Sequence, residues 1–333
     1  MAPNFRICQF EQAFFEPSFG GFSDISTFPL TMREMLEKHL LWISLREVRI
    51  FESIKKDTFK AVVETEDGKC IETVLMKNAR GQFTVCVSSQ VGCAMACTFC
   101  ATGTMGFTRN LTSDEIVDQV RFWNIFLAKR KEIKERISNI VFMGMGEPLA
   151  NYENVKESLR LFFAYTDIGI TRITVSTVGL LPMLRKILDD ETWPAVRLAV
   201  SLHSADGDTR RRMMPSSYAS FLDDLAEWTA RYFQKFESRR RHLTFEYVML
   251  SKINDTESHA EALIAFAYRV GNVRINLIPY NFTGSVYRDS LPGDFMRFQK
   301  QLEDAGITVT RRKTMGDDIS AACGQLVVEK TTL

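Results

Sequence analysis

Four of the seven cysteines in this 333-residue chain lie in one short stretch, CVSSQVGCAMACTFCATG, at residues 86–103. Cys93, Cys97 and Cys100 form a C-x3-C-x2-C motif, and Cys86 stands seven residues before it. Thiolates are soft ligands that suit zinc or iron–sulfur clusters, and a closed site of either kind takes four ligands. This motif supplies three, and none of the four histidines is nearby in sequence. The motif therefore predicts a metal centre with one open position, and a structural zinc site is the alternative.

The composition is typical of a globular protein with a sizeable core, because 45% of the residues are hydrophobic and 25% are charged. The net charge is +1, so contact with a nucleic acid would have to come from local basic patches. The N-terminal residues resemble no signal peptide, and no apolar run is long enough to span a bilayer. We expect a cytoplasmic location, with no membrane or DNA partner. Clustered cysteines in that reducing compartment indicate metal binding or catalysis more often than disulfides.

The elements that must position these cysteines alternate between strands and helices from residue 83 onward. Amphipathic helices are predicted at 113–130, 153–165, 221–236, 257–270 and 293–305. Between them stand six short apolar strand candidates, FTVCVS, ISNIVFMGM, RITVSTVG, VRLAVSLHS, HLTFEYVML and VRINLIPYN. This alternation predicts an α/β fold with a parallel sheet, either an open partial barrel or a doubly wound sheet.

We divide the chain at residue 80. Residues 1–80 are predicted to form a small accessory region with a short helical part and a β-hairpin, since alternating residues flank the pair Asp67-Gly68. Residues 81–333 are predicted to form the core domain, which ends in a C-terminal segment that contains Cys323.

Polar or glycine-rich residues end several of the predicted strands. They stand at residues 144–147, 176–179 and 201–204 and at Asn281. Ligands in parallel α/β folds bind at the carboxyl ends of the strands, so we expect the functional site there.

The motif C-x3-C-x-F-C after a first strand resembles that of the radical S-adenosylmethionine (SAM) superfamily. The blocks CVSSQVGC, MGMGEPLAN, STVG, SLH, NLIPYN and GDDISAACGQL follow in the order seen in the bacterial 23S rRNA adenine-C2 methyltransferases, some of which also act on tRNA. This resemblance implies a partial (β/α)6 radical SAM barrel, with a [4Fe–4S] cluster on Cys93, Cys97 and Cys100 and SAM at the open iron. It also implies 23S rRNA and tRNA as partners and a one-electron reductant such as flavodoxin.

The resemblance also implies how two further cysteines act in the reaction. Carbon 2 of adenine is electron-poor and does not attack the SAM methyl group, so a carbon radical must add to it. Cys323 resembles the methyl-accepting cysteine of the family, which is methylated by one SAM and then loses a hydrogen atom to a radical made from a second SAM. Cys86 resembles the cysteine that resolves the enzyme–RNA adduct by forming a disulfide with Cys323, and Glu72 resembles the proton acceptor.

The family resemblance assigns the SAM contacts to residues at the strand ends. These are Gly146, Glu147, Ser176, Ser201, Leu202, His203 and Asn281. Basic clusters at 210–212, 239–241 and 311–313 are candidates for phosphate contacts, although 239–241 suits a solvated helix end better. Cys8 and Cys70 match no motif, and we interpret them as structural.

Two other functions remain open at this point. The first is methylation at carbon 8 by a resistance-type enzyme, which shares most of these blocks; Pro148 favours the C2 branch weakly. The second is a non-catalytic iron–sulfur protein that binds RNA. Cys86 and Cys323 count against that function, because a purely structural cluster needs neither of them.

Overall fold

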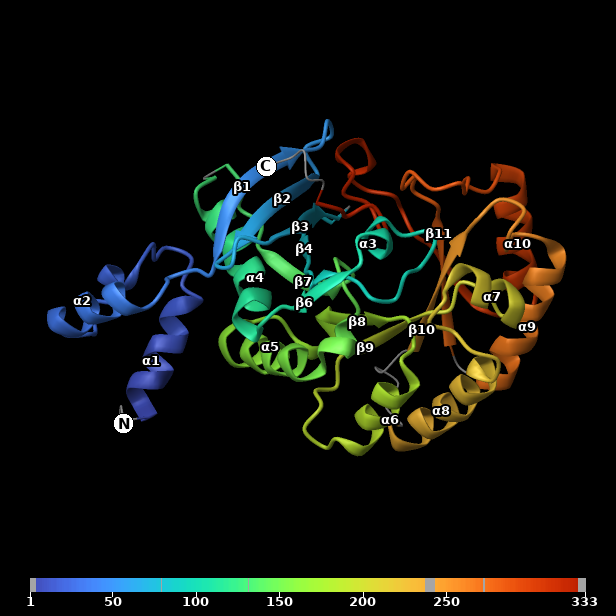
Figure 1. Cartoon of the computed structure of the whole chain (residues 1–333), viewed down its shortest axis with the longest axis horizontal. Helices are drawn as coiled ribbons and strands as arrows, with labels where there is room; N and C mark the ends of the chain where they lie inside the picture. The colour runs from blue at the N-terminus through green and yellow to red at the C-terminus, as the bar shows by residue number, and fades with distance from the viewer. Residues whose placement is uncertain (1–3, 79, 131, 237–242, 272, 329–333) are drawn as a thin grey trace.

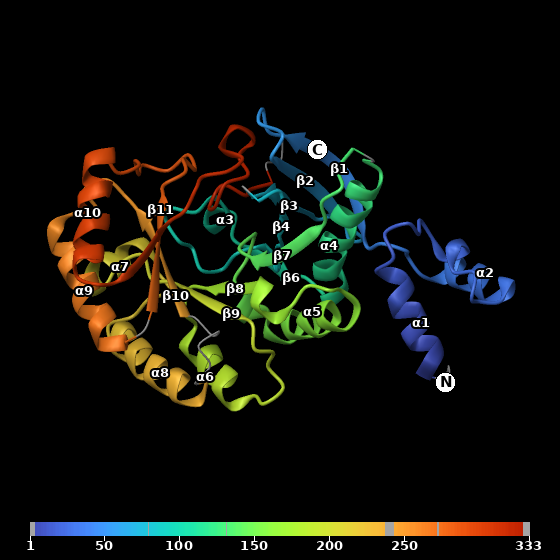
Figure 2. The same cartoon turned by 180° about the vertical axis from the view of Figure 1, so that it is seen from behind.

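A computed structural model describes residues 4–78, 80–130, 132–236, 243–271 and 273–328. Its central sheet contains parallel strands with helices packed around the outside (Figure 1; seen from behind in Figure 2). The parallel strands are β4 (Phe83–Cys86), β7 (Ile137–Phe142), β8 (Ile173–Thr177), β9 (Arg197–Ser201), β10 (Leu243–Met249), β11 (Val273–Pro279) and β12 (Thr308–Arg311). The predicted α/β fold with a parallel sheet is confirmed. The structure adds β12, which the sequence analysis does not predict.

The helices that follow the strands bury one apolar face each against the sheet. The larger helices are α4 (Ser113–Ala128), α5 (Tyr152–Tyr165), α6 (Leu181–Asp189), α7 (Gly207–Met213), α8 (Phe221–Lys235), α9 (Glu257–Val270) and α10 (Pro292–Asp304). Helix α4 begins at a capping box, in which the Thr112 hydroxyl accepts from the Glu115 N–H and the Glu115 carboxylate accepts from the Thr112 N–H. Single turns of 3-10 helix occur at η1 (Phe22–Asp24), η2 (Pro148–Asn151), η3 (Ile170–Arg172) and η4 (Asp317–Ile319). None of the described helices is long and apolar enough to cross a membrane.

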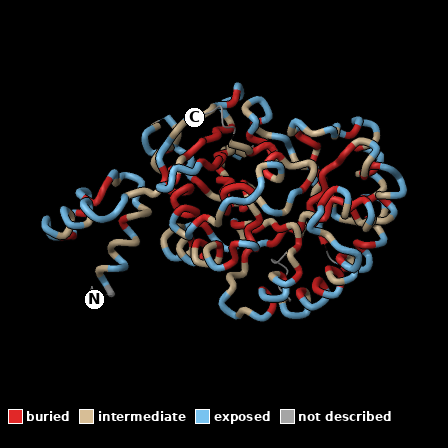
Figure 3. The backbone as a smooth tube through the Cα atoms, viewed as in Figure 1, coloured by how far each residue is buried: buried red, intermediate tan, exposed pale blue. Residues whose placement is uncertain are grey.

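Residues of the accessory region extend the same sheet with antiparallel strands. Strands β1 (Leu45–Glu52), β2 (Thr58–Thr65) and β3 (Cys70–Lys77) continue it beyond β4. The predicted hairpin is confirmed by β2 and β3, and Gly68 in its turn adopts a φ of 73° that favours glycine. Strands β2 and β3 are almost entirely buried, whereas most of β1 is exposed or half-buried (Figure 3). The C-terminal segment and helix α4 both pack against β2 and β3.

Two N-terminal helices, α1 (Asn4–Phe14) and α2 (Leu30–His39), form a small unit with its own aromatic core. Arg121 of α4 attaches this unit to the barrel. Its guanidinium donates to the carbonyl oxygens of Phe14 and Trp42 at 2.6 and 2.7 Å and pairs with Asp118. A buried side chain of the core domain therefore fixes the path of the chain between the helical unit and the sheet.

Candidate active site

The loop with the three clustered cysteines lies between a small two-stranded sheet and a short helix. The sheet consists of β5 (Gln90–Gly92) and β6 (Phe107–Asn110), and the helix is α3 (Ala101–Thr104). The loop is tightly folded, because a Cβ atom on Gly103 would lie 2.7 Å from the Cys97 carbonyl oxygen. A Cβ atom on Gly92 would lie 1.9 Å from the Gly106 carbonyl oxygen. These two glycines allow the backbone to turn the cysteines inward.

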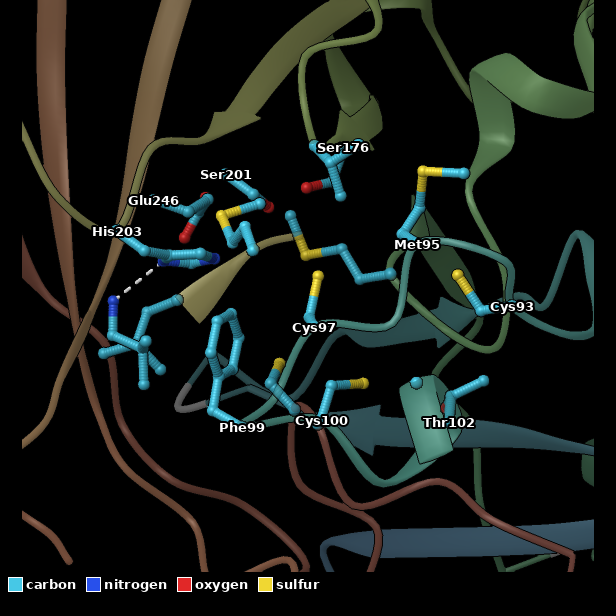
Figure 4. Close-up of a pocket in the computed structure, with 18 of the residues that line it drawn as sticks. Cys93, Met95, Cys97, Phe99, Cys100, Thr102, Ser176, Ser201, His203 and Glu246 are labelled. Carbon is cyan, nitrogen blue, oxygen red and sulfur yellow. Dashed lines mark hydrogen bonds between the residues drawn. The ribbon is translucent and has the colours of Figure 1, made fainter. Parts of the chain in front are cut away.

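Cys93, Cys97 and Cys100 line one cavity, and their sulfur atoms face the same space (Figure 4). Burial raises the pKa of all three thiols, that of Cys93 to about 11, and the neighbouring thiolates raise the pKa of each thiol further. The thiols therefore favour their neutral form, and a bound metal would compensate the charge of the thiolates.

The donor set of this loop suits an iron–sulfur cluster. Three cysteines of the motif line the cavity, and a [4Fe–4S] cluster takes one thiolate on each of its irons. Three thiolates therefore leave one iron for another ligand.

The strand-end residues predicted as SAM contacts surround the same cavity. Its lining includes Gly146, Glu147, Ser176, Ser201, His203 and Asn281, whose segments follow β7, β8, β9 and β11. Leu202 is fully buried and does not line the cavity. The parallel register brings these residues together, since the carboxyl ends of neighbouring strands meet at one edge of the sheet.

Glu147 is a buried carboxylate that lines this cavity. Its oxygens accept from the N–H groups of Leu149 at 3.0 Å and Val178 at 2.7 Å. Burial nevertheless raises its pKa to about 7, because the hydrogen bonds only partly offset the loss of solvation. Glu147 can therefore change its charge near neutral pH.

His203 lines the cavity with an uncharged side chain. Its Nδ1 accepts from the Val248 N–H at 3.0 Å, and its ring meets Phe99 edge to face at 4.9 Å (Figure 4). Burial lowers its pKa to about 3, and the nearby Arg210 lowers it further. The ring therefore carries its proton on Nε2 and stays uncharged at physiological pH.

Cys323 lies at the border of this cavity and a second one. The first cavity contains the clustered cysteines, and the second contains Cys86. Cys86 and Cys323 are both free thiols, and each is close enough to the other for a Cys323 thiolate to raise the pKa of Cys86. Burial is the larger cause of that rise, which takes the pKa of Cys86 to about 12. No disulfide is present among the described residues, so the pairing implied by the family stays a prediction.

The sequence analysis missed two charged residues of the site, Arg312 and Glu246. Arg312 lines both cavities, and its Nη1 lies 3.6 Å from Oε2 of the buried Glu246. Its pKa is raised chiefly by the thiolate of Cys323, then by Glu246 and Cys86. Glu246 could have been noticed as a lone charge inside the apolar strand HLTFEYVML. For Arg312, the basic run RRK suggested phosphate binding instead.

The basic clusters occupy very different environments. The prediction of a phosphate contact is wrong for Arg210, which is 1% exposed, donates to the carbonyl oxygens of Ser201, Leu202 and Val178, and stacks on Phe221. Residues 239–241 lie outside the described residues. In the third cluster Arg311 stacks on Phe295, and Lys313 lines the second cavity, where a phosphate could reach it.

Glu72 lines neither cavity. Its Oε1 pairs with Lys60 Nζ at 2.8 Å, and its Oε2 accepts from the Val327 N–H at 2.9 Å. Its role as proton acceptor stays a prediction. Of the other cysteines, Cys70 is buried in β3 and Cys8 is exposed on α1.

Comparison with known proteins gives concordant results. Residues 87–263 match the model of the Radical SAM superfamily. The dual-specificity RNA methyltransferase RlmN of Desulfotalea psychrophila is 38% identical over 99% of this chain and 91% of its own length. The dual-specificity RNA methyltransferase RlmN of Alcanivorax borkumensis is 42% identical over 83% of this chain and 72% of its own length. The crystal structure of a radical SAM methyltransferase from Sphaerobacter thermophilus superposes with a TM-score of 0.90, at 37% identity, over 98% of this chain and 94% of that one.

Proposed function

Since the chain belongs to the radical SAM superfamily and, within it, to the RlmN family of RNA methyltransferases, we propose that it methylates carbon 2 of an adenosine in RNA. The observation that supports this most directly is the position of Cys323. It borders the cavity of the three clustered cysteines on one side and that of Cys86 on the other. A methyl carrier must meet both its methyl donor and the thiol that later releases its product.

Cys93, Cys97 and Cys100 would hold the [4Fe–4S] cluster. Gly146, Glu147, Ser176, Ser201, His203 and Asn281 would hold SAM. The predicted SAM contact of Leu202 is wrong, because Leu202 does not line the cavity, its N–H donates to the Glu246 carbonyl oxygen and its own carbonyl oxygen accepts from Arg210. When bound, the cluster and SAM together supply a carbon-centred radical that can take a hydrogen atom from an unactivated C–H group. The buried walls of the cavity exclude water from this reactive species.

Cys323, at the border of the two cavities, would carry the methyl group, and Cys86 would release the product. The Cys323 thiol loses its proton, its sulfur attacks the methyl carbon of SAM, and S-adenosylhomocysteine leaves as the thioether forms. After the methyl carbon has lost a hydrogen atom and joined adenine, the adduct gives up one electron, which the cluster would accept, and a base removes the ring proton. The Cys86 sulfur then attacks the Cys323 sulfur, and an S–S bond forms as the S–CH2 bond breaks. The electron pair left on the methylene carbon takes a proton to complete the new methyl group, and a thiol reductant restores the two cysteines.

The substrates of this chemistry would be 23S rRNA and tRNA. Carbon 2 is accessible only in an unstacked base, so the target adenosine would lie in a loop or be flipped out. A flavodoxin-type protein would supply single electrons to the cluster. These partners and the disulfide reduction suit the cytoplasm.

The function is tested by expressing the chain in a bacterium that lacks this modification. We expect 2-methyladenosine in hydrolysed 23S rRNA and in tRNA, each measured separately by mass spectrometry against synthetic 2-methyl and 8-methyl standards. A Cys8→Ala variant is the matched control and should methylate normally, because Cys8 lies on the exposed helix α1. Finding only 8-methyladenosine, or no methyladenosine with a cluster of full iron content, would contradict the proposal.

The affinity for SAM should depend on the charge of Glu147. Its pKa of about 7 leaves it neutral in acid and negative above neutrality. SAM carries positive ammonium and sulfonium groups, so its affinity should rise by about tenfold from about pH 6 to about pH 8. Anaerobic equilibrium dialysis with labelled SAM measures this. Glu147→Gln should flatten the profile, and an unchanged slope in that variant would assign the titration to another group.

A further inference from the structure

We infer that the buried ion pair between Lys60 and Glu72 is a clamp that positions the carrier cysteine, so that the accessory strands take part in methyl transfer. Lys60 lies on β2 and Glu72 on β3, one diagonal step apart in the strand register. The two side chains are 8% and 3% exposed, and Nζ and Oε1 are 2.8 Å apart. We name residues 316–327, which contain Cys323, the carrier segment.

The pair holds the carrier segment on both sides of Cys323. Lys60 Nζ donates to the carbonyl oxygen of Ser320 at 3.2 Å, and Glu72 Oε2 accepts from the N–H of Val327 at 2.9 Å. One contact comes before the cysteine and the other after it. In both cartoon views the segment passes beside β1–β3 (Figures 1 and 2).

The barrel holds the opposite side of the same segment. The Asn281 amide donates to the Cys323 carbonyl oxygen at 3.1 Å, the Ala101 N–H donates to that of Gly324 at 2.7 Å, and the Thr102 hydroxyl donates to that of Leu326 at 2.6 Å. Ala101 directly follows Cys100 in the sequence. The carrier segment therefore lies between the cysteine-rich loop and the accessory strands, and both sides set the position of Cys323.

The chemistry of the pair favours a positioning role. Burying two opposite charges brings little net stability over an apolar pair of similar size, but it fixes geometry through several directed hydrogen bonds. Both oxygens of Glu72 have partners, and Glu72 lines neither cavity. A carboxylate held in this way is poorly placed to take a proton from adenine, so this inference replaces the proton-acceptor role with a positioning role.

The inference rests on the proposed function only in treating Cys323 as the carrier, and its main test needs no RNA. Hydrogen–deuterium exchange of the anaerobically purified, cluster-loaded full chain reports the order of the carrier segment directly. In Lys60→Met and in Lys60→Met/Glu72→Met, amides of residues 318–327 should exchange at least roughly tenfold faster. The double variant removes both buried charges, so it should keep the wild-type melting temperature even where the single variant is destabilised.

One further measurement and two control variants separate positioning from general stability. Mass spectrometry of the Cys323 peptide should show a several-fold lower share of S-methylated cysteine in the two variants, at unchanged iron content. Lys60→Arg preserves the charge and should rescue both readouts. Lys156→Met breaks an ion pair with Asp190 that does not touch the carrier segment. This variant should change neither the hydrogen exchange of the segment nor the methylation of Cys323.

Wild-type exchange in the double variant would overturn the clamp. So would a Glu72→Gln variant with normal exchange and normal Cys323 methylation that accumulates a protein–RNA adduct, because that result identifies Glu72 as the base. If no variant and no wild-type protein methylates RNA, the proposed function fails, while the exchange data still decide whether the pair holds the segment.

Discussion

Replacing Cys323 by alanine is expected to lower RNA methylation by at least roughly a thousandfold while the protein keeps its iron and its fold. Cys323 is the only cysteine that borders both cavities, among the residues that the structure describes. Without its sulfur, no thioether forms, and the radical has no methyl group to activate. Three other thiols still line the cluster cavity, so the metal should remain bound.

The measurement combines iron and sulfide analysis with mass spectrometry of RNA incubated with SAM and reductant. The variant should also form no covalent complex with RNA on denaturing gels. Cys70→Ala is a suitable comparison, because that thiol is buried in β3 away from both cavities and its loss should leave methylation within a few-fold of wild type. Methylation at the wild-type rate in Cys323→Ala would show that the methyl group passes to adenine without this carrier.

Replacing Cys86 by alanine is expected to trap the enzyme on its RNA. Cys86 lines the second cavity beside Cys323 but does not line the first one, so carrier methylation and radical addition should proceed without it. The S–CH2 bond then lacks its attacking thiol, and turnover should fall by at least roughly a hundredfold. Its pKa of about 12 in the free protein means that Cys86 must lose its proton as it attacks.

A protein–RNA band that survives denaturation and disappears after ribonuclease treatment measures the adduct. Cys86→Ala/Cys323→Ala should form no such band, since the adduct needs the carrier sulfur. In the wild-type enzyme, alkylation after single turnover without thiol reductant should find Cys86 and Cys323 blocked as a disulfide. Normal multiple turnover in Cys86→Ala would assign product release to another group.

The grouping of three cysteines and most of the strand-end residues around one cavity could be predicted because the signals for it are local. Cys93, Cys97 and Cys100 lie within one loop, so their spacing alone brings them together. Gly146 follows β7, and Ser176 and Ser201 lie at the carboxyl ends of β8 and β9, in a parallel sheet whose topology places all carboxyl ends at one edge. These features depend on a few neighbouring residues and on a general rule of α/β folds.

The burial of individual charges could not be predicted in the same way. Arg210 and Arg211 are neighbours in one basic run, yet Arg210 is enclosed by backbone carbonyl groups whereas Arg211 lines a shallow surface pocket. Glu72 lies on the hairpin near the N-terminus, yet the carrier segment from the other end of the chain covers it. The energy of a charge depends on the groups that surround it in three dimensions, and those groups come from distant parts of the chain.

The sequence by itself therefore determined the α/β class, the grouping of three thiols in one loop and the edge of the sheet where the cavity lies. Only the tertiary structure decided that Cys86 and Cys323 line the same second cavity, and that Arg312 lines it too and pairs with Glu246. The same is true of the contacts that Lys60 and Glu72 make with the carrier segment. The physical reason is that local backbone preferences and apolar periodicity are encoded by neighbouring residues. Contacts between the N-terminal hairpin and the C-terminal segment form only when the packed sheet brings both ends of the chain together.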